Sequence, residues 1–190
     1  MTIIVCRGGI MAADGIVRTG DLVASVAFPK IIRLRDGRII GTTGCVVDCY
    51  AAQQWFLNGE PEARPSFYGL RSENNEVDIL MLKPDGTIWR NGVGVDGFYP
   101  QPDPTTIGSY AACLVAKAAM ACGQSAVDAV KLVGKLLAGF GGKVAFECVD
   151  PANIVSRAAL PEGWPPGQET RGMSRERAWA EYRAKHPKEE

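Results

Sequence analysis

The chain has 190 residues, and its 21 Lys and Arg residues balance 21 Asp and Glu residues, so its formal net charge is zero. That length suits one domain with a full hydrophobic core, and the charge balance gives no indication of a nucleic-acid or anionic-membrane partner. No apolar run approaches the roughly 20 residues of a membrane-spanning helix, and the short apolar start lacks the basic residues of a secretory signal.

The first 43 residues predict two antiparallel hairpins. Their turns are indicated by Arg7-Gly8-Gly9 and by Asp36-Gly37, because glycine adopts the backbone conformations that tight turns need. Residues 16–27 are looser, with alternating apolar positions but no strong turn signal. The expected strands of the two hairpins are residues 2–5 with 10–13, and residues 30–34 with 38–42.

Residues 45–58 predict the first long helix. The spacing of its apolar side chains favours a buried amphipathic helix, and we expect these side chains to face the core. Residues 59–75 contain Gly and Pro and are expected to form a loop. The apolar positions of the helix are Val46, Val47, Tyr50, Ala51, Trp55 and Phe56.

The second half predicts one more hairpin, two helices and a last strand. Pro84-Asp85-Gly86 marks the turn of the hairpin, and Ser125 with Asp128 is a capping pair for the second of the two helices. Residues 92–104 are rich in Gly, Pro and Asp and are expected to form a loop. The remaining expected elements are strands 77–82 and 87–90, helices 110–122 and 124–138, and strand 143–149.

This order of elements predicts an α+β fold in which two antiparallel sheets lie between layers of helices. We expect one domain over residues 1–150. Residues 151–190 are expected to form a C-terminal extension, because several prolines interrupt regular structure there. A short charged helix over residues 174–185, packed on its own subunit or on a neighbour, and a disordered tail remain as alternatives.

Several kinds of catalytic site are excluded by the residues that are missing. The only histidine, His186, is the fifth residue from the end, which excludes the usual Ser-His-Asp and Cys-His systems. No phosphate-binding glycine motif occurs, and neither a metal nor a cofactor is expected. The six cysteines have no C-x-x-C spacing, which indicates buried, reduced thiols in a cytoplasmic protein.

Thr2 is the strongest candidate nucleophile. Once Met1 is removed, the hydroxyl of an N-terminal threonine can attack a substrate while the α-amine of the same residue takes the proton. The unperturbed pKa of such an amine, about 7.7–8.0, suits a base near neutral pH. Lys30 is a candidate for the cation that supports it, and Asp14 is a candidate for the carboxylate that holds the lysine.

Gly44 is a candidate oxyanion donor. It lies between a predicted strand and the start of a predicted helix, where backbone N–H groups carry partial positive charge. A glycine there leaves the N–H open to a substrate. Each of these residues has an ordinary structural interpretation when taken alone, and only their order and spacing favour a catalytic site.

These residues resemble the proteasome β-type and HslV-like peptidases, which are N-terminal nucleophile hydrolases. The resemblance covers about residues 2–150 and is most specific in the first third. It rests on four segments of the first 48 residues and on Ile107-Gly108-Ser109 before an Ala-rich helix. The four segments are Thr2-Ile3-Ile4-Val5, Met11-Ala12-Ala13-Asp14, Lys30-Ile31-Ile32-Arg33-Leu34 and Gly44-Cys45-Val46-Val47-Asp48.

The resemblance implies a four-layer αββα sandwich and a role for each matching residue. Thr2 would be the nucleophile, Asp14 and Lys30 the supporting pair, Gly44 the oxyanion donor and Ser109 a hydroxyl that positions the amine. The chain departs from the family pattern at four places. The first hairpin is shorter, and Tyr110 follows Gly108-Ser109 where the family has a glycine. Cys45 replaces the second glycine at the helix start, and the Asp and Ser that often precede a late Gly-Gly pair are missing before Gly141-Gly142.

The resemblance implies a threonine-type peptidase or amide hydrolase that works through an acyl-enzyme intermediate. It also implies a homo-oligomeric ring that encloses the sites, peptide or unfolded-protein substrates, and an ATP-dependent unfoldase as a partner. One alternative is a catalytically silent relative that serves as an assembly or binding module. A hydrolase of small non-peptide amides is another.

Overall fold

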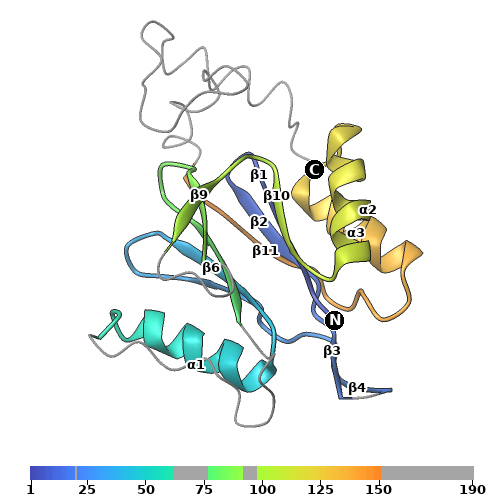
Figure 1. Cartoon of the computed structure of the whole chain (residues 1–190), viewed down its shortest axis with the longest axis horizontal. Helices are drawn as coiled ribbons and strands as arrows, with labels where there is room; N and C mark the ends of the chain where they lie inside the picture. Colours follow the sequence, from blue (N-terminus) through green and yellow to red (C-terminus); the bar gives the residue numbers. More distant parts are fainter. Residues whose placement is uncertain (20, 62–76, 92–97, 151–190) are drawn as a thin grey trace, which may run out of the picture.

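The computed structural model describes residues 1–19, 21–61, 77–91 and 98–150. In these residues two antiparallel sheets pack face to face, with one helix outside one sheet and two helices outside the other (Figure 1). The predicted four-layer αββα sandwich is therefore confirmed. The proposed extension, residues 151–190, lies outside the described residues.

The first sheet contains four strands and includes both the start and the end of the described chain. Its order is β10-β1-β2-β11, with each neighbouring pair antiparallel. The strands are β1 (Ile3–Arg7), β2 (Ile10–Ala13), β10 (Thr105–Gly108) and β11 (Ala145–Cys148).

The second sheet contains five antiparallel strands that follow one another in chain order, and a separate two-stranded hairpin projects from the sandwich near the N terminus (Figure 1). The strands of the sheet are β5 (Ile31–Arg33), β6 (Ile39–Thr43), β7 (Asp78–Leu82), β8 (Ile88–Asn91) and β9 (Tyr99–Gln101). The hairpin consists of β3 (Val17–Thr19) and β4 (Leu22–Ser25).

Apolar side chains fill the space between the two sheets. Ile4 and Met11 of the first sheet pack with Ile39 and Leu80 of the second, and all four are fully buried. Gly41 allows close contact here, because a Cβ at this position would lie 2.9 Å from the sulfur of Met11. This packing holds β1 against the sheet that begins just after Lys30.

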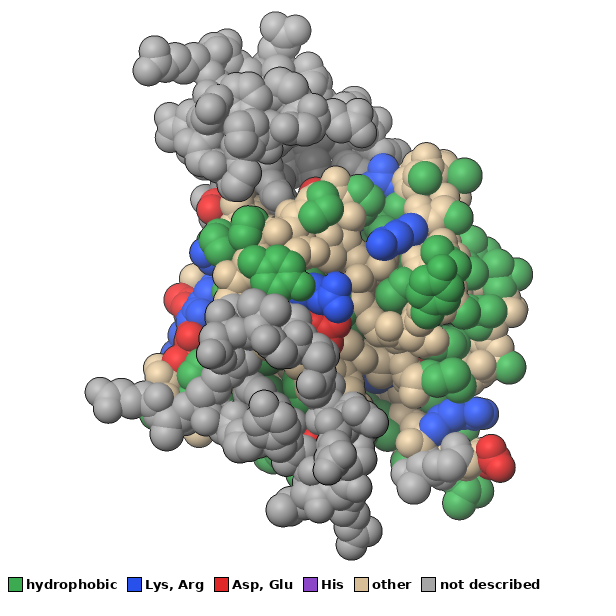
Figure 2. Space-filling model, viewed as in Figure 1, with side chains coloured by type: hydrophobic (Ala, Val, Ile, Leu, Met, Phe, Trp, Pro, Cys, Tyr) green, Lys and Arg blue, Asp and Glu red, His purple; other side chains and the backbone are tan. Residues whose placement is uncertain are grey.

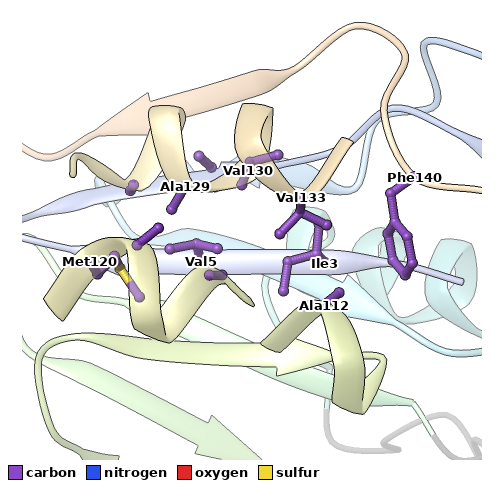
Figure 3. Close-up of a cluster of buried hydrophobic side chains, with 12 residues drawn as sticks. Ile3, Val5, Ala112, Met120, Ala129, Val130, Val133 and Phe140 are labelled. Atoms are coloured by element: carbon purple, nitrogen blue, oxygen red, sulfur yellow. The ribbon is translucent and has the colours of Figure 1, made fainter. Parts of the chain in front are cut away.

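A second apolar core joins the first sheet to α2 (Tyr110–Ala121) and α3 (Ala126–Leu136). Figure 3 shows Ile3 of β1 beside Val133 of α3, with the ring of Phe140 close to this end of the strand. The predicted capping pair is present, since the Ser125 hydroxyl accepts the N–H of Asp128 at 3.1 Å.

The prediction for the buried face of α1 (Val46–Leu57) was right for Phe56, and for Trp55, which packs against the core, but wrong for Val46, Val47 and Tyr50. Val47 and Tyr50 are exposed, whereas Cys49, Gln53 and Phe56 face the core. The apolar residues surround much of this helix, so their spacing does not select one face. Gln53 decides the orientation through hydrogen bonds to the hydroxyl of Thr42 and the carbonyl of Pro29.

Four strands and part of the cysteine prediction also differ from expectation. Residues 16–27 form the β3–β4 hairpin, and both β9 and β10 lie where no strand was predicted. Pro100 indicated a loop rather than a strand. β9 is an edge strand, however, and an edge strand tolerates a residue without an N–H. All six cysteines are free, yet Cys122 and Cys148 are exposed rather than buried.

Exposed apolar side chains gather over α2 (Figure 2). Tyr110 is 78% exposed and Leu114 is 50% exposed. Among the described residues, none of the helices has the length and apolar character that crossing a membrane requires.

Candidate active site

Lys30 and Asp14 form a buried ion pair at one end of the sandwich. Asp14 directly follows β2 and Lys30 directly precedes β5, so the first hairpin and the second sheet each supply one partner. The Lys30 Nζ lies 2.9 Å from Asp14 Oδ1, and the two side chains are only 4% and 0% exposed. A pair this deeply buried costs solvation energy, so its hydrogen bonds must hold it in place.

The pair is attached directly to the start of β1. Asp14 Oδ1 also accepts the N–H of Ile3 at 3.0 Å, and Ile3 is the residue after Thr2. The Lys30 ammonium donates a second hydrogen bond to the carbonyl of Ile16 at 2.7 Å. One N–H of the ammonium and Asp14 Oδ2 have no hydrogen-bond partner within the part of the chain that the structure describes.

Burial lowers the pKa of the Lys30 amine below its usual value of 10.5, while the charge of Asp14 and its hydrogen bond to the amine act in the opposite direction. Desolvation disfavours the ammonium, and the carboxylate stabilises it. The Asp14 carboxylate therefore opposes the effect of burial on the Lys30 ammonium.

Thr2 and Ser109 are held together through their backbones. The N–H of Ser109 donates to the carbonyl of Thr2 at 3.0 Å. Thr2 and Ser109 are half-buried, and the Ser109 hydroxyl, at the start of α2, makes no hydrogen bond with a described residue. The structure therefore brings Thr2, Ser109 and the Asp14–Lys30 pair to the same end of β1.

Gly44 occupies the connection between β6 and α1. Its φ of 140° lies in the region that favours glycine, and the residue is exposed. Cys45, which begins α1, provides no side-chain cap for the helix N–H groups. The N–H of Thr42 donates to the Lys30 carbonyl at 3.0 Å, so Thr42 lies opposite Lys30. Gly44 follows two residues after Thr42.

Comparison with solved structures identifies the fold. Two structures of BPH from Thiobacillus denitrificans match, one of them in complex with epoxomicin. The epoxomicin complex matches with a TM-score of 0.60 and 18% identity over 80% of this chain and 100% of that one. The other has a TM-score of 0.57 and 17% identity over 79% and 98% of the two chains.

Eukaryotic HslV from Trypanosoma brucei matches with a TM-score of 0.54 and 17% identity, over 77% of this chain and 97% of that chain. The chain has the fold of the proteasome β-type and HslV-like proteins. No protein-family model matches the sequence, and no curated protein matches it.

Cys49 is a second candidate nucleophile, because its thiol lies close enough to Lys30 for their charges to interact. Burial raises the pKa of the Cys49 thiol to about 11, so the thiol stays protonated near neutral pH. The described residues bring together no group of three His, Cys, Asp or Glu side chains that could hold a metal ion. Thr2 is therefore the better candidate for a nucleophile.

Alkylation tests whether the Cys49 thiol is as unreactive as its burial implies, because the cysteines differ in exposure. We expect iodoacetamide at pH 7.5 to modify Cys122 and Cys148 in the folded protein, because both are exposed. Buried Cys6 and Cys49 should react only after denaturation. Peptide mass mapping of native and denatured samples measures the difference, and rapid native alkylation of Cys49 would contradict it.

Sequence reasoning missed the loop of residues 137–144, which closes one side of the site. The N–H of Gly15 donates to the carbonyl of Gly141 at 3.0 Å, and the N–H of Lys143 donates to the carbonyl of Val26 at 2.8 Å. A Cβ at Gly142 would lie 2.5 Å from the Val26 carbonyl oxygen. The Gly141-Gly142 pair was the signal for this close contact, although from the sequence it stood out for the Asp and Ser that are missing before it.

Proposed function

We propose that the chain is a threonine-type peptidase or amide hydrolase in which Thr2, exposed by removal of Met1, is the nucleophile. One observation carries the proposal: a buried Lys30–Asp14 pair whose carboxylate binds the N–H of Ile3, directly beside Thr2. A chain that needed only stability would gain little from such a pair, because burying two charges roughly offsets their attraction.

In the proposed reaction, the Thr2 hydroxyl attacks the substrate carbonyl and its proton passes to the freed α-amine. The amine then gives this proton to the leaving nitrogen, and water hydrolyses the acyl-enzyme. The Lys30 ammonium favours the alkoxide and keeps the amine neutral. The N–H of Gly44 stabilises the oxyanion, and the Ser109 hydroxyl positions the amine.

The proposal includes a self-compartmentalising homo-oligomeric ring that acts on peptides or unfolded proteins, fed by an ATP-dependent unfoldase. The HslV-like fold and the exposed apolar side chains of α2 support an assembly of copies. Native mass spectrometry would report subunit number and N-terminal processing together, and a monomer at micromolar concentration would contradict the ring.

Replacing the nucleophile tests the activity itself. We expect Thr2→Ala to lower kcat/KM on small fluorogenic amides by at least about 10³-fold, because no other group described near Lys30 can replace the hydroxyl. Thr2→Ser is the matched control, since it keeps a hydroxyl and permits removal of Met1. Intact mass must first confirm that removal in each variant, and equal rates for wild type and Thr2→Ala would refute the proposal.

A silent assembly module is the second candidate, and one observation favours it. The Asp and Ser that often precede a late Gly-Gly pair in the family are missing before Gly141-Gly142. An epoxyketone, whose ketone and epoxide suit a neighbouring hydroxyl and amine, separates the two candidates. Labelling at Thr2 supports the enzyme, and no labelling of Met1-free protein supports the silent module.

A further inference from the structure

The exposed side chain of Arg18 lies beside the N-terminal residue. Its guanidinium Nη1 is 3.4 Å from the position that a Cβ on Gly139 would take, and the side-chain methyl group of Met1 lies close enough to overlap that position. Gly139 has a φ of 91°, and it provides no side chain that would separate the two. Arg18 and Met1 therefore lie next to each other over Gly139.

The position of Arg18 is fixed by the backbone around it. Arg18 belongs to β3, and the hydrogen bonds from Gly15 to Gly141 and from Lys143 to Val26 join both ends of the β3–β4 segment to the 137–144 loop. Phe140 of this loop is buried in the core that also contains Ile3. The backbone of Arg18 is therefore held at the same end of β1 as Thr2.

The charge of Arg18 is not neutralised within the described structure. Arg18 makes neither a hydrogen bond nor an ion pair with any described residue, and it is exposed. The 137–144 loop contains Lys143 and no acidic residue, and the one acidic residue of the hairpin, Asp21, has no ion pair with Arg18. Among the residues that the structure describes, this side of the site therefore has a positive charge without a partner.

The location of Met1 shows which part of a substrate would meet this charge. In the proposed reaction the Thr2 amine must give its proton to the leaving nitrogen, so the leaving group has to lie beside that amine. Met1 is bonded to the same amine, so Met1 and its neighbours Gly139 and Arg18 are on the leaving-group side.

Resting on the proposed function, we infer that Arg18 is a specificity-determining residue that binds a carboxylate on the leaving-group side of the scissile bond. A guanidinium pairs with a carboxylate through two parallel hydrogen bonds. The carboxylate comes either from an Asp or Glu side chain in the first leaving residue or from the C terminus of a short leaving group.

Quenched fluorescent peptides with one acyl side and varied leaving sides test the inference. One set carries Asp, Asn or Lys as the first leaving residue before an amidated C terminus, and a second set compares Ala with a free or an amidated C terminus. We expect Met1-free wild type to prefer Asp over Asn, or the free over the amidated C terminus, by about threefold to fivefold in kcat/KM, as for a solvated ion pair. The preference should shrink as salt is raised.

The variants are Arg18→Gln, Arg18→Lys and the control Arg35→Gln, which alters another exposed arginine in the β5–β6 turn. We expect Arg18→Gln to bring the preference to about one, Arg18→Lys to keep part of it, and Arg35→Gln to leave it unchanged. An unchanged preference in Arg18→Gln, or an equal fall on a coumarin amide that has no leaving residue, would overturn the inference. Inactivity of wild type on every substrate would instead refute the proposed function.

Discussion

Asp14→Ala is expected to lower the free energy of unfolding by about 3–5 kcal/mol, because it leaves the buried Lys30 ammonium without its counter-charge. The same change leaves the N–H of Ile3 without its acceptor, which adds to the loss. Urea unfolding followed by circular dichroism, at one fixed protein concentration, measures the difference.

Asp36→Ala is the matched control for this prediction. Asp36 also pairs with a basic residue, Arg38, but on the surface, so its loss should cost at most about 1 kcal/mol. Adding Lys30→Met to Asp14→Ala should recover part of the stability, since the unpaired charge is then gone. The explanation would be wrong if Asp14→Ala and Asp36→Ala were equally mild.

The cost of Asp14→Ala should also depend on pH in a defined direction. Burial already lowers the pKa of Lys30, and the loss of Asp14 removes the charge and the hydrogen bond that oppose this effect. When the pKa of a lysine is lower in the folded state than in the unfolded state, the free energy of unfolding increases as the pH rises towards 10.5. The defect of Asp14→Ala should therefore be largest near neutral pH and should shrink as the buried amine loses its proton.

The parts of the fold that the sequence predicts well are those with strong local signals. The turns at Asp36-Gly37 and Pro84-Asp85-Gly86 lie between paired strands as expected, and Ser125 caps the start of α3. The pairing of Asp14 with Lys30 was predicted, but the reason given for it was incomplete, because β2 and β5 belong to different sheets and are not neighbouring strands of one hairpin. Their distance and burial required the three-dimensional structure.

The parts that were missed depend on contacts between distant segments. Gln53 lies on the buried face of α1, where it donates hydrogen bonds to Thr42 and Pro29. The spacing of apolar residues along the helix does not reveal such bonds. β9 is a strand because it pairs with β8, despite its proline. The place of Arg18 beside Met1 depends on Gly139 of the distant 137–144 loop. Such effects of tertiary structure on local preference are expected at a functional site.

Gly108→Ala is expected to cost about 3–5 kcal/mol in stability and to impair the site together with the fold. Gly108 has a φ of 126°, a conformation that side chains disfavour, and a Cβ there would overlap the carbonyl oxygen of Thr2. Relief of this overlap requires that oxygen to move, and with it the hydrogen bond from Ser109. We therefore expect slower epoxyketone labelling of Thr2 even at temperatures where the variant is folded.

Gly123→Ala separates backbone strain from overlap. Gly123 also has a positive φ, 91°, but nothing lies within 4 Å of a Cβ there, so strain alone should cost about 1 kcal/mol and labelling of Thr2 should be unaffected. The difference between the two alanine variants, measured by urea unfolding, isolates the contact between Gly108 and Thr2. If both lost the same stability and were labelled equally fast, β10 would have no role in placing the nucleophile. A larger loss in Gly108→Ala, with slower labelling, would show that the strand beside β1 fixes the position of Thr2 as well as stabilising the sheet.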